Sequence, residues 1–413
     1  MIKILKTIGI VLLSIVGLFV LLFIVGYIVD FFSSFPLNTM AKKARVDITS
    51  YRMDIKENAW DDYLQAMEKV TSLKFDYEAD RYLRGEKNLS SSYPEEIKNY
   101  PDIYPFIVQG NQKSACQPPF NYEDGWNMKL PDYLALQKIA KIIAIRAMRA
   151  LNQNETEKSV NYTTQGLILC DNIIKRGPVP INYMVGVVIY GILRQPLKFG
   201  LENNKYNADQ LRRLRVALSH SEDSLPLLTW ALKCGSDIMK INRYNFTSFG
   251  VRLSCWRYFF SPKLALLKGL NIVENSIESI SQHEKASTEI SNNKNTRGYF
   301  YITDSIPEKS LAKNPILKYD DASYGSLLKR KIELVAKLRS LNLAAEIMEK
   351  ELKVGVLPIT TEGLDGKNVL NPLTGKEWNY FYGGDSAVIS IPPPDSRDLN
   401  RILRLVLKKA GSK

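Results

Sequence analysis

"LPDYLALQKIAKIIAIRAMRAL", residues 130–151, decides the fold class of the chain. Apolar side chains recur along it at helical spacing: Leu134, Ile139, Ile142, Ile143 and Ala147. Lys138, Lys141 and Arg149 fall outside this stripe. Because residues at these spacings lie on one face of an α-helix, the stretch predicts a helix with one face in a core.

Similar helical stretches follow it. After a break at Asn152, residues 155–177 predict a second helix that Gly177 closes, and together the two form a helical hairpin. Residues 181–203, 207–220 and 224–242 continue the pattern, and Asn207 is placed to cap the second of these helices. We therefore predict a mainly α protein with an antiparallel, repeat-like helical array over residues 130–283, which lacks the tetratricopeptide signature. The apolar stripes are interpreted as core.

The N-terminus predicts a membrane anchor. Residues 7–29, "TIGIVLLSIVGLFVLLFIVGYIV", carry no charge between Lys6 and Asp30. At about 1.5 Å per residue they form a helix of roughly 34 Å, enough to cross a hydrocarbon core of about 30 Å. The stretch is too long for a cleavable signal peptide. Residues 1–35 are therefore expected to be an uncleaved transmembrane signal anchor.

The charges beside the anchor predict its orientation. Lys3, Lys6 and the α-amino group precede the apolar stretch, whereas Asp30 follows it. The positive-inside rule then places the N-terminus in the cytoplasm and the bulk of the chain outside it, in the periplasm or at the cell surface. The net charge of +13 is interpreted as a dispersed surface charge or as attraction to anionic lipids or wall polymers. Nucleic acid is not expected as a partner outside the cytoplasm.

The rest of the chain is divided by composition. Residues 36–129 predict N-terminal helices, one at 58–73 and another that begins with Ser92 and Glu95 as a capping box, followed by a structured loop at 116–126. Residues 284–318 are polar and aperiodic and are expected to form a loop or linker.

Residues 319–413 are expected to hold a long helix, a β-hairpin and a basic C-terminal helix. In "NPLTGKEWNYFYGGDSAVISI", residues 371–391, a turn at Asn371 and Pro372 precedes two alternating β runs around Gly383 and Gly384. The glycine and lysine spacing does not fit a phosphate-binding loop.

The C-terminal residues 395–413 combine an apolar stripe with many basic residues. The stripe consists of Leu399, Ile402, Leu403, Val406 and Leu407. This pattern predicts a basic amphipathic helix. Such a helix either packs on the body of the protein or lies on an anionic lipid surface beside the anchor.

Few residues suggest chemistry, and no catalytic, cofactor-binding or metal-binding residue is predicted. Cys170, Cys234 and Cys255 stand in apolar helical contexts and are interpreted as small core residues, although with Cys116 they also allow three disulfide pairings. His220 is expected at a helix end.

Other candidate sites are weak. His220 and His283 are the only histidines of the sequence, and they do not give a zinc-binding spacing. The Ser-x-x-Lys matches at 310–313 and 326–329 lack the companion motifs of penicillin-binding proteins. Calcium ligation by Asp365 and Asp385 is a lesser alternative.

Two groups of residues resemble known proteins. Cys116, Pro119, Tyr122 and Gly125, followed by the helices from residue 130, resemble a family of uncharacterised membrane-anchored bacterial proteins with a helical array. The same family resembles this chain in the step "VGVLP" at 354–358, which follows a helix. The turn "NPLTGKEWNY" at 371–380 resembles the C-terminal hairpin of type II secretion major pseudopilins, with Asn371 where aspartate is usual. The resemblances imply architecture and location but no reaction.

These observations favour a membrane-tethered extracytoplasmic helical scaffold that binds a protein or peptide. The alternatives are an accessory component of a secretion or pseudopilus-like assembly, and a cell-envelope hydrolase whose carboxylates the sequence does not identify.

Overall fold

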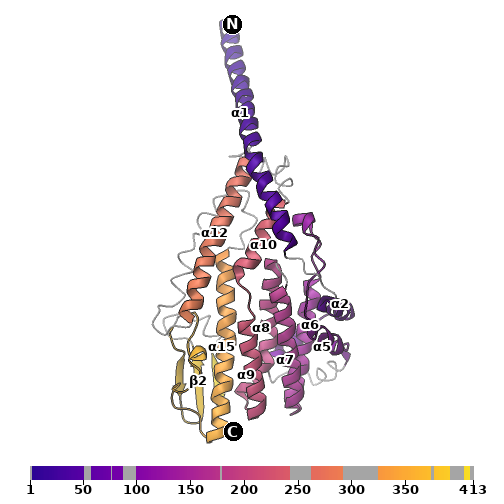
Figure 1. Cartoon of the computed structure of the whole chain (residues 1–413), viewed down its shortest axis with the longest axis vertical. Helices are drawn as coiled ribbons and strands as arrows, with labels where there is room; N and C mark the ends of the chain where they lie inside the picture. The colour runs from indigo at the N-terminus through magenta and orange to yellow at the C-terminus, as the bar shows by residue number, and fades with distance from the viewer. Residues whose placement is uncertain are drawn as a thin grey trace.

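The computed structural model describes residues 2–50, 57–75, 77–86, 99–176, 179–241, 262–291, 324–373, 376–390 and 404–409. They form a mainly helical body with a small antiparallel sheet at one end and a long N-terminal helix that extends from the other end (Figure 1). The mainly α fold class is confirmed. The repeat-like arrangement of the helices stays a prediction.

The N-terminal helix α1, Ile2–Thr49, has two parts with different surroundings. Large apolar side chains are exposed from Val11 to Phe35, whereas Leu37, Ala41 and Ile48 are buried in the body. Pro36 lies between these parts and removes one backbone hydrogen bond, and α1 changes direction near this point (Figure 1). The first part is long and apolar enough to cross a membrane, as the sequence predicts.

The core of the body contains α6 (Tyr133–Asn152), α7 (Thr156–Arg176) and α8 (Pro180–Glu202), which pack against one another. α8 is also apolar enough to pass a test for membrane spans, but 56% of that window is buried inside the protein, as in a core helix. The helical hairpin of α6 and α7 is confirmed. The prediction of the buried α6 stripe is wrong at one residue: Leu134 is 68% exposed, and Leu136 is buried instead.

The next helices complete this core. α9 (Ala208–Asp223) begins at the expected cap, because Asn207 accepts a hydrogen bond from the backbone N–H of Gln210 and the Gln210 side chain accepts one from Asn207. α10 (Leu228–Ile241) runs from α9 toward α1, and the long helix α15 (Tyr324–Val354) packs along α9 and α8. Figure 1 shows these helices side by side below the anchor.

Short helices cover one side of the core: α2 (Ala59–Val70), α3 (Tyr77–Leu83), α5 (Tyr104–Asn111) and the 3₁₀ helix η2 (Tyr122–Asn127). α2 confirms the helix expected within residues 58–73, and η2 lies in the expected loop at 116–126. The expected capping box at Ser92 and Glu95 lies outside the described residues.

Helix α12, Pro262–Ser291, corrects the expected linker. Residues 284–291, assigned by their polarity to a loop, continue this helix, and residues 292–318 lie outside the described part of the chain. At its other end, the backbone N–H of Lys263 donates to the Asp30 carboxylate at 2.9 Å. A residue taken as the outer flank of the membrane span therefore caps α12 and joins it to α1.

The C-terminal part begins with the short helix α16 (Gly366–Val369) and continues as a sheet in the order β1-β2-β3. The hairpin of β1 (Asn379–Tyr382) and β2 (Ser386–Ser390) confirms the expected one. A bridge between Leu370 and Glu377 closes the turn that the sequence places at Asn371.

The third strand, β3 (Leu405–Lys408), shows that the basic C-terminal helix is wrong at these residues. Leu405 and Leu407 are buried and alternate with the more exposed Val406 and Lys408. Buried side chains therefore recur at every second residue, as in a strand. The strand packs on the body at the end opposite the anchor (Figure 1). It does not lie beside the apolar first part of α1, as the lipid-surface interpretation requires. Leu399, Ile402 and Leu403 lie outside the described residues.

Candidate functional site

Cys170 in α7 and Cys234 in α10 are buried free thiols. This confirms the prediction that they are small core residues. The Cys170 thiol donates to the carbonyl oxygen of Gly186 at 3.0 Å, and burial raises its pKa well above the usual value. Cys116 is also buried, although the sequence left its environment open. Cys255 and the Ser-x-x-Lys match at 310–313 lie outside the described residues.

The histidine and calcium candidates have other contacts. His220 lies in the last turn of α9, as expected, with its Nε2 atom 3.3 Å from the hydroxyl of Ser224. The side chain of His283 is not among those described. Asp365 caps α16 by accepting from the backbone N–H of Lys367 at 3.1 Å. Among the described residues no group of His, Cys, Asp and Glu side chains could hold a metal ion, and Asp365 and Asp385 do not form one.

The second part of α1 packs against the end of the body from which its apolar first part extends. Ala44 and Ile48 of α1 belong to one apolar cluster with Cys234 and Ile238 of α10. Outside this cluster, Arg45 pairs with Glu123 of η2 at 3.4 Å. Because α1 is continuous, its buried second part joins the apolar first part directly to the body.

The opposite end of the molecule exposes apolar side chains. They are Leu352, Val354, Val356, Ile359 and Phe381, and we call them the distal apolar tip. Val354 is 71% exposed, Ile359 73% and Phe381 67%. Strand β1 is joined to the loop that carries most of this tip, because the Tyr380 hydroxyl donates to the carbonyl oxygen of Pro358 at 2.6 Å. Four of these five side chains lie within the eight residues 352–359, and exposed apolar surface of this kind is typical of interaction sites.

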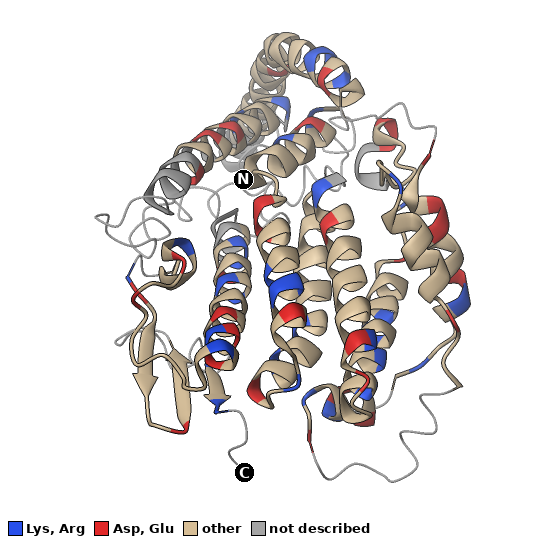
Figure 2. Ribbon diagram, turned by 60° about the horizontal axis from the view of Figure 1, so that its bottom comes forward, with Lys and Arg blue, Asp and Glu red and all other residues tan. Residues whose placement is uncertain are grey.

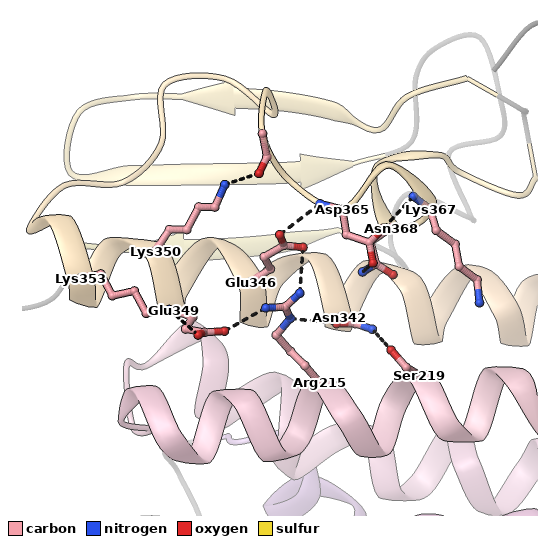
Figure 3. A network of polar contacts seen from close by, with 11 residues as sticks. Arg215, Ser219, Asn342, Glu346, Glu349, Lys350, Lys353, Asp365, Lys367 and Asn368 are labelled. Carbon is pink, nitrogen blue, oxygen red and sulfur yellow. Dashed lines mark hydrogen bonds and ion pairs between the residues drawn. The ribbon is translucent and has the colours of Figure 1, made fainter. Parts of the chain in front are cut away.

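A polar network fixes the distal tip to the core (Figure 3). Arg215 of α9 bridges two carboxylates of α15: its Nη1 atom lies 2.9 Å from Glu349 and its Nη2 atom 3.3 Å from Glu346. Glu346 then accepts from the backbone N–H of Asp365 at 3.1 Å, and Asn342 donates to the Ser219 hydroxyl at 2.8 Å. The network therefore connects α9, α15 and the loop before the sheet.

The network continues along the same two helices. Nε and Nη2 of Arg339 both donate to Oε1 of Glu222, at 3.0 and 2.8 Å. Lys367 reaches the same helix by pairing with Asp223 at 2.8 Å. Partial burial lowers the pKa of Lys367, but the carboxylates of Asp223 and Glu222 together raise it above the usual value. The ion pairs hold the C-terminal sheet unit against the helical core.

One carboxyl group outside this network has an unusual pKa. Burial of Asp171 on α7 raises its pKa to about 7, while a hydrogen bond from the Ser221 hydroxyl at 2.9 Å and the charge of Lys175 act against the rise. Asp171 is therefore a carboxyl group that changes charge near neutral pH. It lies between α7 and α9, with burial rather than a second carboxylate as the main cause.

The net charge of the protein does not gather on one face. Figure 2 shows Lys and Arg interspersed with Asp and Glu along the helices. This distribution agrees with the dispersed surface charge that was one of the two interpretations of the sequence.

No protein-family model matches the sequence, and neither a curated protein nor a solved structure matches the chain. The resemblances to membrane-anchored bacterial proteins and to pseudopilins therefore stay predictions.

Sequence analysis did not predict the distal apolar tip. The available signal was the run from Val354 to Ile359, which has almost only apolar side chains and follows directly after a helix. Gly355 and Pro358 carry a resemblance, but the sequence does not show that Val356 between them is exposed while Leu357 is buried.

Proposed function

We propose that the protein is a membrane-tethered helical scaffold that binds a protein or peptide partner through its distal apolar tip. The observation that carries this proposal is the continuous helix α1, which is exposed and apolar in its first part and buried in the body in its second. Such a helix holds the tip at the end of the body opposite the anchor (Figure 1). A partner would then bind at a defined distance from the membrane.

The tip has features that suit a protein segment. It combines exposed aliphatic side chains with Phe381, and buried apolar and aromatic anchors contribute most to the affinity of protein interfaces. β1 is an edge strand in the order β1-β2-β3, so its outer edge leaves backbone groups available to an extended peptide. An extended peptide with apolar side chains is the partner chemistry that fits best.

The orientation in this proposal follows the charges beside the anchor, with the N-terminus in the cytoplasm and the body outside. Alkaline phosphatase fused after Lys413 is expected to be active in a bacterial host. An inactive fusion, together with an active cytoplasmic reporter at the same position, would reverse the orientation.

Site-specific photo-cross-linking in native membranes tests the binding surface. A photoreactive residue at Ile359 or Phe381 of the full-length chain is expected to give a discrete adduct. The same residue at Leu134 is a matched control, because Leu134 is 68% exposed but stands on α6, away from the tip. The adduct should disappear when Val356 is replaced by glutamate. Equal labelling from Leu134, or no adduct from either tip position, would refute the proposed surface.

The alternative function is an accessory component of a secretion or pseudopilus-like assembly. It is favoured by the small antiparallel sheet, whose first hairpin follows the turn at Asn371. The same adducts separate the two functions: a structural subunit of a filament or secretion machine would support the alternative, and a peptide segment of another client would support the scaffold.

A further inference from the structure

The core helix α8 carries a row of polar side chains on one face. Tyr190, Arg194, Lys198 and Glu202 follow one another at intervals of four residues. Residues at this spacing are neighbours on a helix surface. α8 meets α15 and β3, so the row extends toward the junction of these three elements.

Arg194 is the most unusual member of this row. It is 5% exposed, and its Nε and Nη2 atoms are buried without a hydrogen-bond partner in the part of the chain that the structure describes. The hydroxyl of Tyr190, a residue only 2% exposed, is also buried without a partner there. Burying a guanidinium without an acceptor is costly, and native proteins rarely do it.

Another arginine of the same protein shows what Arg194 lacks. Nε and Nη2 of Arg339 both donate to Oε1 of Glu222, at 3.0 and 2.8 Å. These two atoms form the edge of the guanidinium that binds carboxylates and phosphates through paired hydrogen bonds. In Arg194 the same edge has no acceptor. An oxyanion at this position would supply one.

Other cations raise the positive potential around Arg194. Burial lowers the pKa of Lys337 on α15, and the charges of Arg194 and Arg330 lower it further. Burial also lowers the pKa of Lys198; Glu202 acts against this change, whereas Arg194 and Arg404 act in the same direction as burial. Burial is the main cause for both lysines, and the neighbouring cations add to it, so a bound anion at this junction would be stabilised by several positive charges.

Two carboxylates lie near these cations and offset part of their charge. Glu202 accepts from the backbone N–H of Val406 at 3.1 Å and lies 3.7 Å from the amino group of Lys198. Glu333, one turn from Lys337, opposes the lowered pKa of that lysine but does not restore it to the usual value. Neither residue forms a hydrogen bond with the free edge of Arg194.

We propose that Arg194, Lys198 and Lys337 bind a phosphate-type oxyanion, either inorganic phosphate or the phosphoryl group of a small molecule, between α8, α15 and β3. A phosphate fits better than a carboxylate, because its second charge offsets more of the surrounding cations. The side chain of Lys198 is 26% exposed, so the row reaches solvent at this end. The site does not depend on the scaffold function or on the distal apolar tip.

Phosphate binding can be measured on the full-length chain in a nonionic detergent. Titration with inorganic phosphate is expected to raise the melting temperature by several degrees relative to sodium chloride of equal ionic strength, and calorimetry should give a saturable isotherm. Sulfate should compete, because it has the same tetrahedral shape. The nonionic detergent and washing with chloride exclude phospholipid headgroups as the source of the signal.

Substitutions connect the signal to the site. Arg194→Met should remove the phosphate-dependent shift, and Arg194→Lys, which keeps the charge without the paired edge, should weaken binding about tenfold or more. Arg212→Met is a matched control, since Arg212 is an exposed α9 arginine that pairs with Asp209 at the surface. This control should bind phosphate like the unaltered protein.

The stability of Arg194→Met without phosphate is a second readout. Because the guanidinium edge has no partner, the variant should then be at least as stable as the unaltered protein. The proposal is overturned if the unaltered protein shows no shift beyond that in chloride, or if Arg194→Met keeps the shift. If Arg194→Met does not fold, Lys337→Gln takes its place: loss of the shift would support the proposal, and an unchanged shift would overturn it.

Discussion

Replacing Glu284 with alanine should destabilise the junction of α10, α12 and α15. Glu284 is 2% exposed, and its carboxylate accepts from the backbone N–H groups of Leu228 and Thr229 at 2.6 and 3.1 Å. The same carboxylate pairs with Lys331 of α15 at 2.6 Å. One side chain therefore caps the first turn of α10 and neutralises a lysine from a third helix.

The size of the effect follows from these contacts. Alanine leaves the Lys331 amino group, whose side chain is 15% exposed, without this carboxylate. Removing one partner of a buried ion pair costs about 3–5 kcal/mol, and losing a helix cap about 1 kcal/mol. The two contributions share one carboxylate and do not add in full, so about 3–5 kcal/mol is expected for Glu284→Ala. Glu284→Gln keeps an acceptor oxygen but loses the charge, and about 2 kcal/mol is expected.

Urea denaturation of the full-length chain in detergent, followed by circular dichroism, measures this change. Glu278→Ala is the matched control: Glu278 is an exposed residue of the same helix whose hydrogen bond with Gln282 is 3.4 Å long, so a change below about 0.5 kcal/mol is expected. Adding Lys331→Met to Glu284→Ala should recover part of the loss, since no unpaired amino group remains. A Glu284→Ala variant within about 0.5 kcal/mol of the unaltered protein would refute the reasoning.

Two further predictions concern the core. At Gly186 a Cβ atom would lie 2.0 Å from the Ile174 side chain, so Gly186→Ala should lower the free energy of unfolding by about 1–3 kcal/mol. At Gly191 on the same helix a Cβ atom meets nothing within 4 Å, so Gly191→Ala should raise the free energy of unfolding by up to about 1 kcal/mol. Equal melting temperatures of the two variants would contradict this contrast. Burial raises the pKa of Asp171 to about 7, so the folded chain binds its proton more tightly than the unfolded chain, and stability should be lost as pH rises from about 4 to about 7. The loss of stability is expected to be on the order of 2 kcal/mol after allowance for partial exposure, and Asp171→Asn should remove it. If the urea midpoints of the unaltered protein and of Asp171→Asn depend on pH in the same way, the prediction is wrong.

Long helices with strong periodicity and clear caps could be predicted from the sequence. In α9, for example, the local hydrogen bonds between Asn207 and Gln210 define where the helix begins. The β1-β2 hairpin could also be predicted, because Gly383 and Gly384 separate two short alternating runs. Contacts between near neighbours in the chain determine all of these features.

The C-terminal tail could not be predicted in the same way. Its apolar residues fit a helical stripe through Val406 and Leu407 and also a strand with Leu405 and Leu407 on one face. Pairing with β2 and a hydrogen bond from Val406 to Glu202, far earlier in the chain, favour the strand. The local pattern contains neither contact.

The polar end of α12 shows the same difficulty. Residues 284–291 look like a linker because their composition is hydrophilic, but Glu284 is buried by contacts with α10 and α15. The residues around Glu284 in the sequence do not show that its carboxylate caps a neighbouring helix. Composition therefore gave the wrong boundary, and a deletion that starts at residue 284 should remove part of the core rather than a linker.

Arg194 is a case in which the sequence did contain a signal. The stretch 181–203 is strongly apolar, and Arg194 and Lys198 interrupt it at the four-residue spacing that places them on one face. A cation on a helix that must be buried needs an acceptor from elsewhere, so the pattern predicts either a carboxylate partner or a bound anion. The packing of α15 and β3 brings Lys337 and Arg404 near Arg194 and Lys198, while Glu202 pairs with Lys198 and accepts from the backbone N–H of Val406. Because Lys198 has a carboxylate partner and the buried edge of Arg194 has none among the described residues, Arg194 is the cation that favours a bound anion.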